Sequence, residues 1–75
     1  NERLEGFVAA FGLTKRERDV LEALVASDDS VQDVAASLFL SRSTLYRHIA
    51  SINKKVEVTS RVALINYFWS WTPQD

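Results

Sequence analysis

Apolar residues recur along this chain at the spacing of α-helices, and the strict alternation typical of β-strands is absent. The apolar positions of residues 2–11 share one helix face: Leu4, Phe7, Val8 and Phe11. Gly12 follows them, and glycine readily adopts the left-handed conformation that ends a helix. The pattern predicts an amphipathic helix that ends at this glycine.

A second helix is expected to begin at Thr14. Thr14 and Glu17 have the spacing of a capping box, in which each side chain bonds the backbone N–H of the other residue. An apolar stripe at helical spacing follows: Val20, Leu21, Leu24 and Val25. The polar residues 28–30 interrupt the pattern, so the helix is expected to end before them.

A short helix, a tight turn and a longer helix are expected between residues 30 and 56. Ser30 and Ser41 can cap the two helices, since serine oxygens accept backbone N–H groups at helix starts. The turn falls at residues 39–40, and the longer helix runs from Arg42 to about Val56. Both helices have apolar stripes: Val31, Val34, Ala35 and Leu38, then Leu45, Ile49, Ile52 and Val56. This arrangement is typical of a helix-turn-helix element, although helix pairs with short turns also occur in bundles.

Thr59 or Ser60 can cap a fifth helix that runs to about Trp71, shortly before Pro73. The links between the helical segments are short, and the chain has no internal repeat or low-complexity tract. The pattern therefore predicts an all-α fold.

Composition narrows the possible classes of protein. The 75 residues suffice for one domain, and the 47% hydrophobic content favours a folded chain. With no cysteine and one histidine, His48, neither a disulfide framework nor a metal site is expected. No apolar run reaches the length of a membrane span and no signal peptide is recognisable, so a cytoplasmic domain is expected. Because methionine is also absent, we expect a longer protein, which could be anchored in a membrane elsewhere.

The net charge of -1 conceals an uneven distribution. Residues 41–61 carry five basic side chains and one acidic side chain, whereas the rest of the chain is acidic. Attraction to DNA depends on the local patch more than on the total charge. The segment therefore indicates either a nucleic-acid surface or an ordinary solvated helix face.

Four motifs stand in the order and spacing of one family. Residues 13–21 resemble its opening LTxRExEVL, and residues 34–38 resemble its IAxxL. Residues 41–48 resemble its SxxTVKxH, and residues 52–61 resemble its I..KLGVxSR. Over about three quarters of its length, the chain thus resembles the LuxR/FixJ/NarL-type DNA-binding domains.

The resemblance implies a four-helix helix-turn-helix domain at residues 13–72, preceded by an extra helix or linker at residues 1–12. The third helix of such a domain, here residues 42–56, contacts bases in the major groove of double-stranded DNA. Domains of this kind typically bind half-sites as homodimers through the last helix. They usually end a longer regulator, so a sensor domain in the full-length chain is expected.

The chain departs from the family pattern at several places. Tyr46 stands where the family has a lysine, and residues 31–33 replace an NKE motif whose lysine would contact a phosphate. Glu57 and Asp28 replace glycines, so Glu57 must adopt an awkward backbone conformation or change the turn. These departures affect the expected target sequence and affinity rather than the fold.

DNA contacts are expected from the exposed side of residues 42–56 and from the helix cap. Arg47 can pair with guanine, and Tyr46 can contact a thymine methyl group or a phosphate. Lys54 and Lys55 can follow the phosphates or, alternatively, offset the helix dipole. The complete set is Ser41, Arg42, Ser43, Thr44, Tyr46, Arg47, Ala50, Ser51, Lys54 and Lys55.

Structural roles are expected for several other conspicuous residues. His48 is expected to support its helix or touch a phosphate, and Arg61 to donate to backbone carbonyls of a neighbouring turn. Phe68 and at least one tryptophan are expected to pack against the first helix. A homodimer surface on the last helix is expected at Val62, Asn66 and Trp69.

The leading interpretation is the output domain of a transcription regulator, a binding protein with neither catalytic activity nor a cofactor. One alternative is a protein-interaction module on a helix-turn-helix scaffold that has lost DNA binding, which would fit the acidic remainder of the chain and Tyr46. Another is a promoter-recognition domain similar to region 4 of sigma factors. Binding to DNA that weakens with salt would separate the first interpretation from the protein-interaction module.

Overall fold

The computed structural model describes residues 1–26 and 28–73, and the regular elements within these residues are all α-helices. In chain order they are α1 (Glu2–Phe11), α2 (Lys15–Ala26), α3 (Val31–Ser37), α4 (Arg42–Val56) and α5 (Arg61–Ser70). The predicted all-α fold, with a helix ahead of the four that the family pattern implies, is confirmed.

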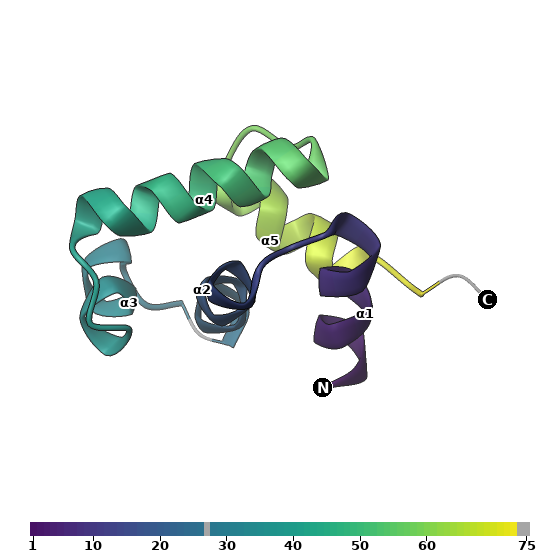
Figure 1. Cartoon of the computed structure of the whole chain (residues 1–75), viewed down its shortest axis with the longest axis horizontal. Helices are drawn as coiled ribbons and strands as arrows, with labels where there is room; N and C mark the ends of the chain where they lie inside the picture. The colour runs from purple at the N-terminus through teal and green to yellow at the C-terminus, as the bar shows by residue number, and fades with distance from the viewer. Residues whose placement is uncertain (27, 74–75) are drawn as a thin grey trace.

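Helix α2 lies at the centre of the molecule and contacts each of the other four helices. Figure 1 shows α4 extending along one side of the molecule, α3 at one end and α1 at the other. The N-terminus lies at the α1 end, where the C-terminal part of α5 passes close to α1. The molecule measures 37 × 21 × 21 Å. Helix α4 runs roughly along the longest of these dimensions (Figure 1).

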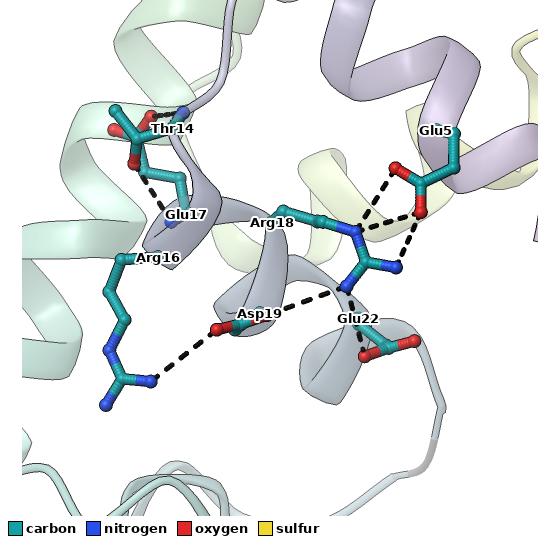
Figure 2. A network of polar contacts seen from close by, with 7 residues as sticks. All are labelled: Glu5, Thr14, Arg16, Glu17, Arg18, Asp19 and Glu22. Carbon is teal, nitrogen blue, oxygen red and sulfur yellow. Dashed lines mark hydrogen bonds and ion pairs between the residues drawn. The ribbon is translucent and has the colours of Figure 1, made fainter.

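Local capping chemistry places the helix ends close to their predicted positions. Thr14 N–H donates to Glu17 Oε1 at 2.8 Å and Glu17 N–H donates to Thr14 Oγ1 at 3.1 Å, which completes the capping box (Figure 2). Gly12 ends α1 in the left-handed conformation, with φ of 66°. Three serines accept backbone N–H groups at the starts of α3, α4 and α5: Ser30, Ser41 and Ser60. Of the two candidate caps for the last helix, Ser60 is therefore the one used.

All five helices contribute to one hydrophobic core. Its buried members include Leu4 and Phe7 of α1 as well as Leu64 and Phe68 of α5. The remaining members are Leu13, Val20, Leu21, Leu24, Val34, Ala35, Leu45, Ile49, Ile52 and Val56. The predicted apolar stripes thus face inward, and burial of apolar surface supplies most of the stabilisation.

Polar contacts fasten α1 to the rest of the domain. Arg18 of α2 donates to both carboxylate oxygens of Glu5, at 2.6 Å from Nη2 to Oε2, and also faces Asp19 and Glu22 (Figure 2). Arg3 NH1 donates to the backbone carbonyl of Trp71 beyond the end of α5. Helix α1 is therefore tied to both α2 and the chain that follows α5.

In the described part of the chain, two residues other than glycine adopt the left-handed conformation. Glu57 ends α4 with φ of 65°, which confirms that it takes the conformation expected where the family has glycine. Phe39 has φ of 58° in the turn between α3 and α4, and its side chain is 96% exposed. This conformation brings Cβ close to the following carbonyl oxygen, so both residues are strained by comparison with glycine.

Among residues 1–26 and 28–73, no helix combines the length and hydrophobicity needed to cross a bilayer. The same residues include no group of three or more His, Cys, Asp or Glu side chains placed to hold a metal ion.

Candidate nucleic-acid interface

Helix α4 has one side in the core and the opposite side in solvent. Leu45, Ile49, Ile52 and Val56 are buried, as their spacing predicts. The opposite side carries Ser43, Tyr46, Arg47, Ala50 and Lys54, which recur at three- and four-residue intervals and are all exposed. The helix therefore presents a continuous outward face of polar and basic side chains.

The basic groups on this face are not neutralised within the domain. The side chains of Arg42, Arg47 and Lys54 form no hydrogen bond or ion pair with any residue that the structure describes. Tyr46 directly precedes Arg47 on the same face, and 54% of its surface is exposed. Unpaired cations with a neighbouring aromatic ring are available to an anionic partner such as a phosphate backbone.

Hydroxyl groups gather at the N-terminus of α4. Ser41 Oγ accepts the Thr44 N–H at 3.1 Å, donates to Thr44 Oγ1 at 2.9 Å and lies 3.2 Å from Ser43 Oγ. Ser41 therefore caps the helix, while Ser43 is exposed and Thr44 is half-buried. The positive end of the helix dipole lies here, in an orientation that favours a negative charge.

Ser51 and Lys55 lie on a different side of α4 and approach α2. Ser51 Oγ donates to Glu17 Oε2 at 2.5 Å, and Lys55 Nζ donates to Glu17 Oε1 at 2.7 Å. Lys55 Nζ also lies 3.4 Å from the carbonyl oxygen of Gly12. These two expected DNA contacts therefore bond to other residues of the domain and stand apart from the outward face.

The Glu17 carboxylate is nearly enclosed, with 5% of its side chain exposed. Burial by itself would raise the pKa of Glu17. The hydrogen bonds from Lys55, Ser51 and the Thr14 N–H outweigh that effect and lower the pKa from 4.5 to about 2. Glu17 is therefore ionised at neutral pH, and Lys55 is its counterion.

The bonds from Ser51 and Lys55 to Glu17 were not predicted from the sequence, although the sequence contains a signal for them. Glu17 precedes Val20, Leu21 and Leu24 by three, four and seven residues, so it lies on the apolar stripe of α2. An acidic residue at such a position needs a buried partner. Assigning Glu17 to a cap alone overlooked its second oxygen, which was free to bond elsewhere.

Arg16 is a second residue that sequence reasoning left without a role. Its Nη2 donates to the Leu38 carbonyl at 2.9 Å. Its Nη1 lies 3.7 Å from Asp19 Oδ2, a pair drawn in Figure 2. The bond to Leu38 joins the start of α2 to the turn between α3 and α4. Arg16 thus helps to fix that turn.

A groove of about 360 Å³ borders the outward face of α4. It is lined by Tyr46, Ala50 and Asn53 of α4 and by Ser60 and Arg61 at the start of α5, among others.

Arg61 is half-buried, and within the described residues it forms none of the expected bonds to backbone carbonyls. His48, also on α4, is half-buried.

Helix α5 is apolar on more than one side. Phe68 is buried, and Trp71 packs edge-on against Phe7 with ring centroids 5.4 Å apart, so the expected packing against α1 is confirmed. Val62 and Trp69 are 63% and 52% exposed, and Asn66 is also exposed. The three residues expected to form a dimer surface are therefore accessible.

A short helix, a tight turn and a longer helix with an outward basic face define a helix-turn-helix domain. Residues 12–68 match the model of the luxR family of bacterial regulatory proteins, and the chain belongs to this family. The family is one of regulatory proteins and not of enzymes. The resemblance indicated by the sequence motifs is thus confirmed.

Two proteins of Bacillus subtilis (strain 168) are similar to the chain. Spore germination protein GerE is 43% identical over 49 residues, which cover 65% of this chain and 65% of GerE. The uncharacterized transcriptional regulatory protein YhcZ is 39% identical over 51 residues, which cover 68% of this chain and 23% of YhcZ. The chain therefore spans less than two thirds of each relative. No solved structure matches it at a significant level.

Proposed function

We propose that this chain is the sequence-specific DNA-binding output domain of a transcription regulator, and that α4 enters the major groove of double-stranded DNA. The observation that carries the proposal is the outward face of α4, where the side chains of Arg47 and Lys54 have no partner among residues 1–26 and 28–73. An α-helix fits the major groove of B-DNA, where each base pair presents a distinct set of donors and acceptors. Membership of the luxR family supports the same function.

The side chains assigned to DNA divide into two roles. Arg47 lies mid-face and is assigned to a guanine, while Tyr46 and Ala50 border it and suit contact with a thymine methyl group. Arg42, Lys54 and the hydroxyls of Ser43 and Thr44 lie toward the helix ends and are assigned to phosphates: Arg42, Ser43 and Thr44 at the N-terminus and Lys54 at the C-terminus. Base contacts would select the sequence, and phosphate contacts would set the orientation.

A second copy and a sensor complete the proposal. The exposed positions Val62, Asn66 and Trp69 are assigned to a homodimer contact through α5, which would join two half-sites. A cytoplasmic regulator with a sensor elsewhere in its full-length chain would supply the signal. The match to YhcZ supports a sensor elsewhere in the full-length chain, because the matched region covers only 23% of that regulatory protein.

The test begins with selection of bound DNA from a random pool, followed by titration of the selected site and of random DNA at several salt concentrations. We expect the logarithm of affinity to fall linearly with the logarithm of salt concentration, because bound cations release counterions. Arg47→Ala should weaken binding to the selected site by roughly ten- to a hundredfold and binding to random DNA far less. Lys54→Ala should weaken both to a similar extent.

The protein-interaction module remains the second candidate, because the chain outside residues 41–61 is acidic and Tyr46 replaces a basic residue of the family pattern. Absence of any binding to DNA at low salt would favour that candidate and refute ours. The sigma-factor alternative is no longer needed, since membership of the luxR family accounts for the opening motif at residues 13–21.

A further inference from the structure

The carboxylate of Glu17 holds α4 at two points that lie one helical turn apart. Its Oε2 accepts from Ser51 and its Oε1 accepts from Lys55, two residues separated by four positions on α4. The Thr14 N–H also donates to Oε1, at 2.8 Å, and anchors the carboxylate to the start of α2. Both oxygens of this buried group are therefore used.

Two anchors on one helix restrict motions that apolar packing permits. Packed aliphatic side chains allow a helix to rotate or slide slightly, because dispersion contacts have little directionality. Hydrogen bonds to a carboxylate require defined distances and angles. The pair of bonds from Ser51 and Lys55 therefore sets both the rotation of α4 about its axis and its displacement along α2.

A contact of this kind serves geometry more than stability. Removing two charges from water is costly, and a buried ion pair often adds little to the free energy of unfolding compared with an apolar replacement. The rotation of α4 determines where Arg47 and Tyr46 point, because they lie on the same rigid helix. A small rotation would move both groups away from their base edges.

We infer that Glu17 is a positioning residue for the outward face of α4, and that Ser51 and Lys55 bind this carboxylate instead of DNA. The inference rests on the proposed function in so far as the face being positioned is the one that contacts DNA. The inference gives the two neighbouring lysines different partners: Lys54 contacts the DNA phosphates, and Lys55 binds the Glu17 carboxylate.

The neighbouring lysines provide a matched pair for the test. Lys54→Met and Lys55→Met each remove one positive charge from the last turn of α4, and circular dichroism identifies conditions in which both variants are folded. We expect Lys54→Met to reduce the salt slope of DNA binding by about 0.9. Lys55→Met should leave the slope unchanged and lower the affinity ratio of selected over random DNA about tenfold, the value of one well-placed base contact.

Conservative variants separate positioning from a purely structural role. Lys55→Arg keeps a cation at the same place and should restore the ratio of selected to random affinity. Glu17→Gln keeps an oxygen for the Thr14 N–H but loses the charge, and should lower the ratio while helix content is retained. If Lys55→Met reduces the salt slope as Lys54→Met does and leaves the ratio intact, Lys55 contacts phosphate and the inference is wrong.

A separate measurement decides the contact even if the wild-type chain binds no DNA. That outcome would refute the proposed function, but the Glu17 carboxyl carbon can still be titrated by NMR. An upward move of its titration midpoint in Lys55→Met would support the bond between Glu17 and Lys55. An unchanged midpoint would overturn the inference.

Discussion

The ring of Phe7 on α1 meets the ring of Phe68 on α5 edge-on, with centroids 5.2 Å apart and planes inclined at 66°. Both side chains are almost fully buried. Edge-to-face pairs of this kind contribute beyond the area that they bury. Although α1 precedes the region that matches the luxR family, it completes the core of the domain.

Replacement of Phe7 should test whether α1 belongs to the folded domain or is only a linker at residues 1–12. We expect Phe7→Ala to lower the free energy of unfolding by about 3–5 kcal/mol, through lost burial and the cavity that remains. Urea denaturation followed by circular dichroism measures the change. Phe39→Ala is the control, because its exposed ring should alter stability by less than about 0.5 kcal/mol. An unchanged midpoint for Phe7→Ala would mean that α1 is dispensable.

Stability should fall in acid because of Glu17. Its pKa is lowered from 4.5 to about 2 in the folded state, so its contribution is complete above pH 4.5 and disappears as the pH falls toward 2. The shift sets an upper limit of about 3 kcal/mol for this contribution. Urea unfolding at a series of pH values from 7 to 2.5 measures the loss.

Two variants separate the contribution of Glu17 from that of other carboxylates. Lys55→Met should lose less free energy of unfolding than the wild type as the pH falls from 4.5 to 2.5, since the cation that holds Glu17 ionised is removed. Glu5→Gln should retain most of the loss of unfolding free energy in acid. The hydrogen bond from Arg18 also lowers the pKa of Glu5, but that carboxylate is exposed and its contribution is screened by solvent. If Lys55→Met loses as much free energy of unfolding in acid as the wild type, the loss does not come from Glu17 and its bond to Lys55.

Glycine at position 57 should stabilise the domain. Glu57 ends α4 in the left-handed conformation, which is strained for a residue with a Cβ atom. We expect Glu57→Gly to raise the free energy of unfolding by about 1 kcal/mol, the preference for glycine at a helix C-terminus. Glu57→Ala removes the same charge but keeps the strain, so it should gain less. Equal gains from both variants would assign the effect to the charge at the negative end of the helix dipole.

The proposed dimer contact on α5 predicts a loss of cooperativity. Trp69→Glu places a charge in the proposed contact, so binding to DNA with two half-sites should lose its advantage over a single half-site. Ala9→Glu is the matched control, because it adds the same charge at an exposed position of α1. Analytical ultracentrifugation of the complexes and titration of both DNAs measure the outcome. Unaltered cooperativity in Trp69→Glu would refute the contact.

The amino-acid sequence by itself determined the helices and their inward faces. The capping box of Thr14 and Glu17, the left-handed Gly12 and the serine caps depend on groups within one helical turn of each other. Such bonds are set by spacing along the chain, so the pattern predicted them. The inward positions of α4 followed from its apolar period for the same reason.

The long-range partners of Glu17 and Arg3 depend on how the helices pack against each other. Ser51 and Lys55 lie 34 and 38 residues from Glu17, and Arg3 lies 68 residues from Trp71. A polar residue beside the apolar stripe of a helix can face solvent or a neighbouring helix, and its helical period does not distinguish the two. For Lys54 and Lys55, adjacent and identical in type, the packing of α2 against α4 made the difference, since it brought a buried carboxylate within reach of one lysine and left the other in solvent.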